Sequence, residues 1–212
     1  MPKDHGRADA SDPLEQPWRS GIFKDSVKGP VWLGRTNLAG DGQADTKHHG
    51  GPNKAVLGYS AEHYPDWNRE LAPLEFPHGG FGENFTISGQ DELSVCVGDT
   101  YAVGDAVLQV SQPRQPCVNL ARKWRLPDLP ALVMKSARGG WYFRVLIEGH
   151  VEAGQDVRLV ERPFPDMPIA RVFALYRDGA DRETALRLAA CPLLSPSWRK
   201  AFAEMAEQSR AK

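Results

Sequence analysis

The feature that most constrains this 212-residue chain is a change of pattern near residue 165. Up to that point, short apolar stretches alternate with glycine and proline turns, which is typical of short strands in a closed sheet. After a proline-dense joint at residues 162–168, apolar residues recur at helical spacing. The sequence therefore predicts a mainly β fold, a β-barrel or similar closed sheet with a few helices, followed by a small three-helix domain.

Three regions follow from this change of pattern. Residues 1–20 carry few apolar anchors and are predicted to be a flexible or wrapping N-terminal segment. Residues 21–165 form the predicted barrel, and residues 166–212 form the predicted helical domain. About forty helical residues are marginally stable alone, so we expect this domain to dock on the barrel.

The individual elements are predicted from apolar alternation, helical spacing and turn residues. One hairpin is expected across Gly104 and Asp105, and another through Gly149 and Gly154. Ser195 is expected to cap the last helix, with proline at its first position. The predicted strands cover residues 21–24, 31–34, 55–59, 85–87, 95–103, 106–110, 141–147 and 157–160, and the predicted helices cover residues 60–71, 118–124, 126–137, 169–178 and stretches from about 181 and from 196.

A stiff loop at residues 111–117 ends in a cysteine. Pro113 and Pro116 fix φ and remove two backbone donors, so the loop is not expected to join a strand ladder. Cys117 directly precedes a predicted helix and lies near Arg114, and both the amide dipoles and the guanidinium would lower its pKa. On residue type alone, an inert buried cysteine in a proline-rich turn explains the same pattern.

Two further loops combine glycines with polar side chains. Residues 40–55 hold two adjacent histidines, two lysines and a Gly-Gly-Pro bend, and residues 79–84 have the same character. Glycine lets the backbone approach a ligand closely, while lysine and histidine supply positive charge. Together with the loop that ends at Cys117, these segments predict a pocket for an anionic ligand.

The overall charge and cysteine content exclude several classes of protein. A formal net charge of −1 gives no basic surplus for binding nucleic acid. No apolar run approaches the ~18 residues of a membrane span, and the charged N-terminus is unlike a signal peptide. Three cysteines without a CxxC pair favour a reducing compartment, and Cys96 and Cys191 are predicted to be structural. We expect a cytoplasmic protein without nucleic-acid or membrane partners.

Four motifs, in order along the chain, resemble the MOSC domain family, named for the C-terminal domain of molybdenum cofactor sulfurase. The motifs are Gly-Asp-Gly-Gln-Ala-Asp-Thr-Lys-His-His-Gly-Gly-Pro-Asn-Lys-Ala at residues 40–55, Phe-Gly-Glu-Asn-Phe at residues 81–85, Val-Gly-Asp at residues 97–99 and Ser-Gln-Pro-Arg-Gln-Pro-Cys at residues 111–117. The tail from residue 167 is similar to the three-helix domain that follows MOSC in the YiiM-like branch.

This resemblance implies a distorted β-barrel that binds the molybdenum cofactor (molybdopterin), a pterin dithiolene carrying molybdenum and a phosphate. It implies that Cys117 ligates the metal. It also implies an oxidoreductase that reduces N-hydroxylated compounds, such as hydroxylated base analogues, hydroxylamines and amidoximes, in detoxification. Because the cofactor is labile, protein made in another host can lack it.

The residues themselves indicate how such a site would work. Reduction of N–OH to N–H needs two electrons, which side chains do not supply, so a redox cofactor is required. His48 or His49 would protonate the departing hydroxyl or, alternatively, cap the glycine-rich loop. Arg114 would bind the pterin phosphate or, alternatively, form a salt bridge in the barrel. The predicted cofactor-binding residues are Lys47, Gly50, Gly51, Asn53, Lys54, Gly82, Glu83, Asn84, Ser111, Gln112 and Arg114.

Three alternatives stay open. The chain could carry or deliver the cofactor or its sulfur without turnover. A zinc site could combine Cys117 with His48 and His49, although adjacent histidines lack the i, i+4 spacing of two ligands on one helix. A pyridoxal phosphate site would need Lys47 or Lys54 as its Schiff-base lysine.

The partners follow from the motifs that the sequence lacks. It contains no GxGxxG fingerprint after a strand and no cysteine cluster, so flavin, NAD and iron–sulfur sites are not indicated. A reductase of this kind would then take its electrons from a separate electron-donor protein. The other expected partners are a small N-hydroxylated substrate and a second copy of the chain in a homodimer.

Overall fold

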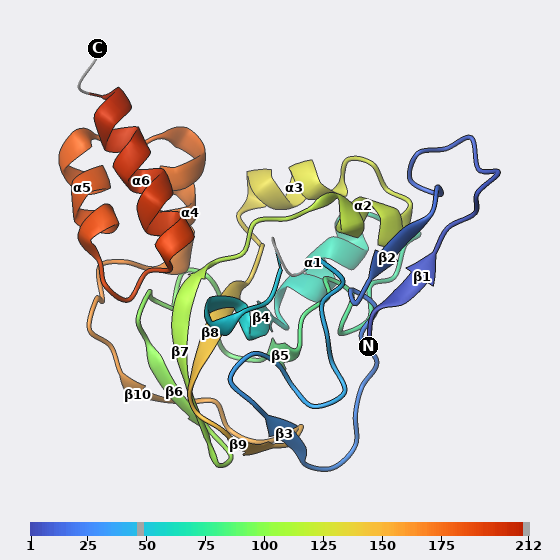
Figure 1. Ribbon diagram of the computed structural model, residues 1–212, viewed down its shortest axis with the longest axis horizontal. Coiled ribbons are helices and arrows are strands. Elements are labelled where there is room, and N and C mark those ends of the chain that lie inside the picture. The colour runs from blue at the N-terminus through green and yellow to red at the C-terminus, as the bar shows by residue number, and fades with distance from the viewer. Residues whose placement is uncertain (46–48, 210–212) are drawn as a thin grey trace.

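The computed structural model describes residues 1–45 and 49–209, and it places a curled sheet between an N-terminal hairpin and a C-terminal helical unit (Figure 1). The strands are β1 (Lys3–His5), β2 (Trp18–Ser20), β3 (Val31–Leu33), β4 (Val56–Ser60), β5 (Phe85–Ile87), β6 (Thr100–Val103), β7 (Ala106–Pro113), β8 (Trp141–Ile147), β9 (Gly149–Val151) and β10 (Arg158–Glu161). The helices are α1 (His63–Glu70), α2 (Val118–Trp124), α3 (Leu129–Ser136), α4 (Ile169–Asp178), α5 (Arg182–Ala190) and α6 (Pro196–Gln208), with a 3₁₀ turn, η1, at Pro52–Lys54.

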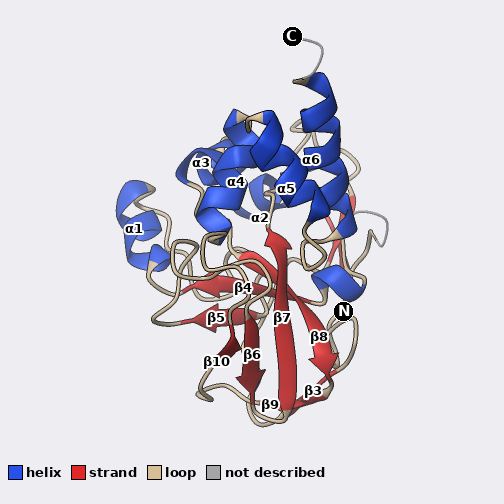
Figure 2. Ribbon diagram, turned by 90° about the vertical axis from the view of Figure 1, so that its left-hand side faces the viewer, coloured by secondary structure: helices blue, strands red, loops and turns tan. Residues whose placement is uncertain are grey.

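Six strands form the main sheet in the order β10-β6-β7-β8-β4-β5. Its pairs are antiparallel except β4 and β5, which are parallel. The sheet curls into a half-barrel, with α2 to α6 at one end of it and α1 at its side (Figure 2). The predicted fold class, a mainly β distorted barrel followed by a three-helix domain, is confirmed.

The centre of the sheet is the pair of β7 and β8. In β8, Trp141, Phe143 and Val145 are buried and alternate with more exposed residues, as expected for a strand with one face in the core. Phe143 lies opposite Val110 of β7. This alternation is local in the sequence, and the predicted bounds of β8 agree with the structure.

The strand β7 is longer than predicted. It continues through Gln112 and Pro113, which lie opposite Tyr142 and Trp141 of β8, so the prediction that this stretch would stay out of a ladder was wrong. The register shifts between Val110 and Gln112, and a bulge of this kind lets a strand accept an irregular end. Proline ends the strand, where no further ladder donor is required.

Two other strand predictions were wrong. Residues 21–24 are not a strand, and the first half of residues 95–103 forms a turn before β6. The expected hairpin through Gly149 and Gly154 also does not form, because β9 pairs with β3 and β10 pairs with β6. Glycine turns marked the reversals of the chain correctly, but they could not identify the pairing partner.

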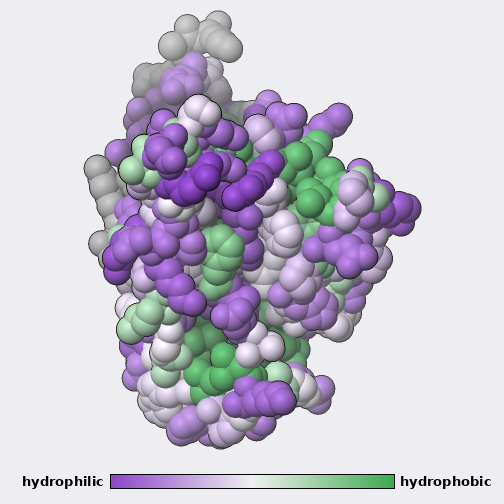
Figure 3. All heavy atoms as spheres, turned by 90° about the vertical axis from the view of Figure 1, so that its right-hand side faces the viewer, coloured by the Kyte–Doolittle hydropathy of each residue, from purple (hydrophilic) through white to green (hydrophobic). Residues whose placement is uncertain are grey.

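The N-terminal segment has more structure than its composition indicated. β1 and β2 form an antiparallel hairpin in which His5 lies opposite Trp18. The rings of His5, Trp18 and Phe23 pack together with centroid distances of 4.4–6.0 Å. An aromatic cluster therefore orders the hairpin. The face of the molecule on this side carries hydrophilic residues interrupted by apolar patches (Figure 3).

The C-terminal helices dock on the sheet through a shared core, as expected. Ile169, Phe173, Trp198 and Phe202 are buried in the same cluster as the sheet residue Leu108. Burying a large apolar side chain stabilises a fold by roughly 1.5–3 kcal/mol, so this contact is substantial. The predicted bounds of α4 and the predicted start of α6 at Pro196 agree with the structure.

Polar contacts add to this docking. The amide of Ile169 donates to Val95 O at 2.8 Å, and the amide of Ser195 donates to Ser111 O at 2.9 Å. Arg162 in the proline-dense joint forms two hydrogen bonds, of 2.9 and 2.7 Å, to the fully buried carboxylate of Asp99. None of the helices in the described residues is long and apolar enough to cross a membrane.

Candidate functional site

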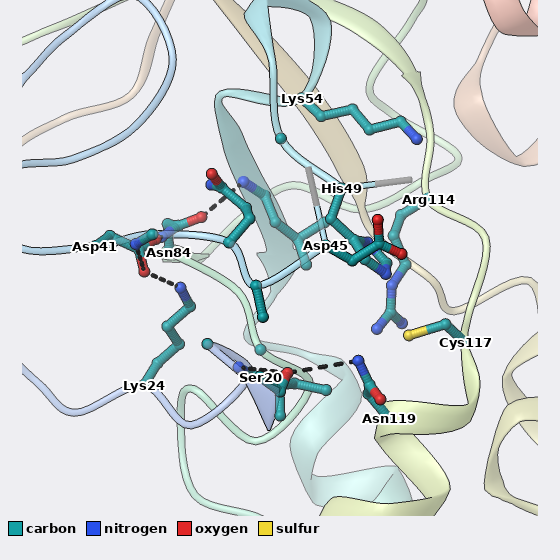
Figure 4. A pocket seen from close by; sticks show the side chains of 18 of the residues that line it. Ser20, Lys24, Asp41, Asp45, His49, Lys54, Asn84, Arg114, Cys117 and Asn119 are labelled. Atoms are coloured by element: carbon teal, nitrogen blue, oxygen red, sulfur yellow. Dashed lines mark hydrogen bonds and ion pairs between the residues drawn. The ribbon is translucent and has the colours of Figure 1, made fainter. Parts of the chain in front are cut away.

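A pocket of about 700 Å³, including open solvent at its mouth, lies between the end of β7, the glycine-rich loops and the N-terminal hairpin. Its lining includes Arg114 and Cys117 from the β7–α2 connection and Asn119 from the first turn of α2 (Figure 4). His49 and Lys54 come from the stretch before β4. Segments far apart in the sequence therefore converge on one cavity. The convergence of the three polar loops is what the sequence predicted.

Cys117 lies at the junction of β7 and α2. It is the N-cap residue of α2, with extended backbone angles, and its side chain is partly buried against the pocket. In Figure 4 its sulfur points into the cavity, beside the guanidinium of Arg114. The two other cysteines, Cys96 and Cys191, are buried away from this lining.

The surroundings of Cys117 favour its thiolate. Burial raises the pKa of the thiol, but a hydrogen bond with the His49 side chain and the charge of Arg114 outweigh burial. The resulting pKa of Cys117 is about 7, so a large share of the sulfur is ionised near neutral pH. A thiolate is a soft ligand for a metal.

Arg114 is a buried cation with an unused donor. Arg114 is 4% exposed, and its Nη2 donates to the carbonyl of Phe81 at 3.2 Å. Its Nη1 is buried without a hydrogen-bond partner among the described residues. A buried charged donor without a partner is costly, so this atom is placed to receive an anionic group in the pocket.

The opposite wall is held by an ion pair. Lys24 pairs with Asp41, and the amide nitrogen of Asn84 donates to the same carboxylate at 2.7 Å. The carbonyl oxygen of the Asn84 side chain accepts from the amide of Leu57 at 3.0 Å. Asn84 therefore connects β4 to the loop that carries Asp41, and Figure 4 shows the group across the cavity from Cys117.

Lys54 and Tyr142 complete the polar lining. The Lys54 Nζ lies 5.9 Å from the centre of the Tyr142 ring, within range of a cation–π interaction. Burial lowers the pKa of Lys54, while the charge of Asp45 opposes this shift. Burial raises the pKa of Tyr142, while Arg114 opposes it, so the phenol stays protonated at neutral pH.

Comparison with known proteins identifies the fold that carries this pocket. Residues 45–158 match the MOSC domain, and residues 167–208 match the YiiM-like 3-alpha helix domain. The chain belongs to the MOSC-domain family. This family is associated with the molybdenum cofactor, and the pocket lies within and beside its MOSC domain.

Three similar proteins illustrate the relationship. The uncharacterized protein YflK of Bacillus subtilis is 43% identical over 185 residues, which cover 86% of this chain and 83% of YflK. The crystal structure of YiiM from Geobacillus stearothermophilus superposes with a TM-score of 0.78 at 36% identity and covers 96% of both chains. A protein of Gibberella moniliformis named "Reductase" is 37% identical over 161 residues, which cover 74% of this chain and 28% of that protein.

Five of the predicted cofactor-binding residues of the MOSC domain lie outside the pocket lining. Glu83 is buried and accepts hydrogen bonds from Gly79 N, Phe81 N and Thr86 Oγ1, so it orders the loop that carries Gly82. Ser111 Oγ donates to Asn53 O at 2.6 Å. The five residues are Gly51, Asn53, Glu83, Ser111 and Gln112, whereas Gly50, Lys54, Gly82, Asn84 and Arg114 line the pocket.

Two predicted site residues, Lys47 and His48, lie outside the described residues. The zinc alternative requires His48 and therefore extends beyond the part of the chain that the structure describes. Within the described part, no group of three His, Cys, Asp or Glu side chains is placed to hold a metal ion. The described histidine of the pair, His49, is next to Cys117.

The structure also places residues in the site that sequence reasoning missed. Arg19, Ser20 and Lys24 reach the pocket from the N-terminal hairpin and the stretch after it. Asn119 follows Cys117 by two positions, and its amide donates to Ser20 Oγ at 3.4 Å. Only Asn119 could have been found from the sequence, because a side chain so close to Cys117 at a helix start lies near the same cavity.

Proposed function

We propose that this protein is a molybdenum-cofactor-dependent reductase of N-hydroxylated compounds. One observation carries the proposal: the Cys117 thiolate and the unpartnered Nη1 of buried Arg114 border the same pocket of a MOSC domain. A soft sulfur ligand beside a buried cation suits a group that combines a metal with negative charge. The similarity to a protein named "Reductase" supports the same class of reaction.

The residues present fit this cofactor. Cys117 would ligate the metal through sulfur, and Arg114 would bind an anionic oxygen of the cofactor. Lys54 adds a second positive charge to the lining, and Asn84 fixes the wall that faces Cys117. When bound, the cofactor supplies the two electrons that no side chain supplies.

The overall reaction would convert R–NH–OH, two electrons and two protons to R–NH2 and water. The N–O bond breaks and the oxygen leaves as water, so one proton must reach the departing oxygen. His49 lies beside Cys117 and is a candidate to hold that proton.

The test uses protein made in a host that synthesises the molybdenum cofactor. Molybdenum is measured by mass spectrometry and extracted pterin by fluorescence, for wild type and for Cys117→Ala. Cys191→Ala is the matched control, because Cys191 is buried in the helical domain and does not line the pocket. Turnover is measured on an N-hydroxylated purine with reduced methyl viologen as electron donor.

We expect near-stoichiometric molybdenum and turnover in wild type and Cys191→Ala, and loss of both in Cys117→Ala. Bound cofactor without turnover on any N-hydroxylated compound would indicate a cofactor carrier instead. A wild-type protein that contains no molybdenum and no pterin would contradict the proposal. Zinc that depends on Cys117 would also contradict it.

A further inference from the structure

About half of the described residues that line the pocket precede the body of the MOSC domain. They come from residues 19–24, at the end of the hairpin and just after it, and from residues 41–45, in the loop after β3. We call these two runs the N-terminal wall. The pocket is therefore closed on one side by two runs that, apart from Asp45, precede the residues matched to the MOSC domain.

The N-terminal wall is fixed to the rest of the site by hydrogen bonds. Lys123 of α2 donates from Nζ to Ile22 O at 3.2 Å and to Gly79 O at 2.7 Å. The two runs also touch each other, because a Cβ added at Gly21 would lie 2.2 Å from Gly42 O. A wall tied to α2 and to the 79–84 loop has a defined position relative to Cys117.

Two arginines of the pocket lining lie at different depths. Arg114 is buried beside Cys117, with Nη1 unpartnered among the described residues. Arg19 belongs to the N-terminal wall, and its side chain is 59% exposed. Its Nη1 donates to both carboxylate oxygens of Asp4, at 3.3 and 3.1 Å. Because the Asp4 side chain is 77% exposed, this is a surface ion pair of small free energy that a ligand anion can replace. Lys24, in contrast, forms an ion pair with Asp41 in which both side chains are largely buried.

We propose that the N-terminal wall selects the substrate and that Arg19 binds an anionic substituent of it, remote from the N–OH group. This inference rests on the proposed function, in which the deep cation Arg114 serves the cofactor. An exposed guanidinium at the rim can form two parallel hydrogen bonds to a phosphate or carboxylate. The favoured substrates are therefore N-hydroxylated molecules that carry such a group, such as a nucleoside monophosphate.

The experiment compares charged and neutral forms of two substrates. The first pair is an N-hydroxylated adenine nucleoside and its 5′-monophosphate, and the second is N-hydroxybenzamidine with and without a ring carboxylate. We expect kcat/KM to favour the charged form about tenfold in wild type. Preference in the first pair alone identifies phosphate as the recognised group, and preference in both pairs identifies anions in general.

Arg19→Ala should remove most of this preference by lowering kcat/KM for the charged forms much more than for the neutral forms. Arg7→Ala is the matched control, because Arg7 is an exposed arginine of the same N-terminal region that pairs with Glu15 and does not line the pocket. Molybdenum and pterin content should stay at the wild-type level in both variants. Calorimetric titration with adenosine monophosphate and adenosine gives a readout that does not depend on turnover.

Equal kcat/KM for charged and neutral substrates in wild type would overturn the inference, as would an Arg19→Ala variant that loses pterin. A wild type that reduces no N-hydroxylated compound would refute the proposed function instead. In that case the calorimetric titrations still test whether Arg19 binds the anionic group. Weaker binding of the monophosphate alone in Arg19→Ala supports the inference, and equal binding overturns it.

Discussion

The side chain of His49, from the glycine-rich loop, lies beside the sulfur of Cys117 at the start of α2 and lowers the pKa of its thiol. Together with the charge of Arg114, this contact overcomes the effect of burial on the thiol. It joins two of the four sequence motifs that carry the resemblance to MOSC domains, at residues 40–55 and 111–117. Because the lowered pKa is a property of the protein alone, the ionisation of Cys117 can be measured in cofactor-free protein.

The first prediction concerns the reactivity of Cys117 in cofactor-free protein. Because the pKa of its thiol is about 7, alkylation by iodoacetamide should reach half its maximal rate near pH 7. His49→Ala should move the midpoint upward, because burial then acts with less opposition. Peptide mass spectrometry measures the modification at each pH. Cys96 and Cys191 are buried internal references, and a midpoint unchanged in His49→Ala would contradict the prediction.

The same shift predicts how stability depends on pH. The folded-state pKa of Cys117 lies below the usual value of 9.0, so the unfolded chain binds more protons between about pH 7 and 9. The free energy of unfolding of wild type, relative to Cys117→Ala, should therefore rise across that interval. Urea titrations at pH 6.5 and 9 test this, and a difference that falls with pH would oppose it.

Arg114→Met should reduce cofactor retention at least tenfold. The substitution keeps an unbranched side chain but removes the buried donors, including the hydrogen bond to Phe81 O. Arg144→Met is the control: Arg144 is a half-buried arginine that donates to Asn53 and Gln109 outside the pocket lining. Molybdenum per folded protein, measured after gel filtration, should fall only in Arg114→Met.

Lys123 should make the N-terminal wall sensitive to alkaline pH in a defined direction. Burial lowers the pKa of Lys123 to about 8, from the usual 10.5, so only the unfolded chain keeps this proton between these values. The stability of wild type relative to Lys123→Met should rise from pH 8 to pH 10.5, by roughly 1–2 kcal/mol once solvent screening is allowed for. Lys200→Met, at an exposed i, i+4 pair, should show no such trend in urea titrations.

Arg162→Met should destabilise the contact between the sheet and the helical domain by about 3–5 kcal/mol. The substitution leaves the fully buried carboxylate of Asp99 without its charged partner. Arg69→Met removes an exposed pair with Asp66 and should change stability by less than ~1 kcal/mol. Chemical denaturation of both variants provides the comparison. Equal losses in the two variants would show that burial of Asp99 does not set the cost.

Several parts of this fold could be predicted because their signals are local. The apolar stripe of α4, with Ile169, Val172 and Phe173 buried, depends only on the spacing of residues along one helix. The alternation of Trp141 and Phe143 in β8 is equally local. In the site, the position of Cys117 after a proline-rich stretch and the start of α2 could be predicted for the same reason.

Other parts depend on partners that the sequence does not identify. Glycine turns around β9 and β10 marked where the chain reverses, but β9 pairs with β3, more than one hundred residues earlier. Pro113 joins the ladder only because a bulge in β7 shifts its register against β8. Pairing of this kind is decided by the whole sheet, since each strand satisfies its hydrogen bonds with whichever neighbour the topology supplies.

The sequence alone determined the two architectural parts of this protein, the family and the cysteine at its centre, because periodicity, turn residues and contiguous motifs are properties of neighbouring residues. Only the tertiary structure decided which side chains surround that cysteine. Arg19 and Lys24 carry no local signal of a site, and Glu83 has the polarity of a ligand but orders a loop. The reason is physical: a pocket is formed by surfaces that meet when distant segments pack, and packing depends on all of them at once.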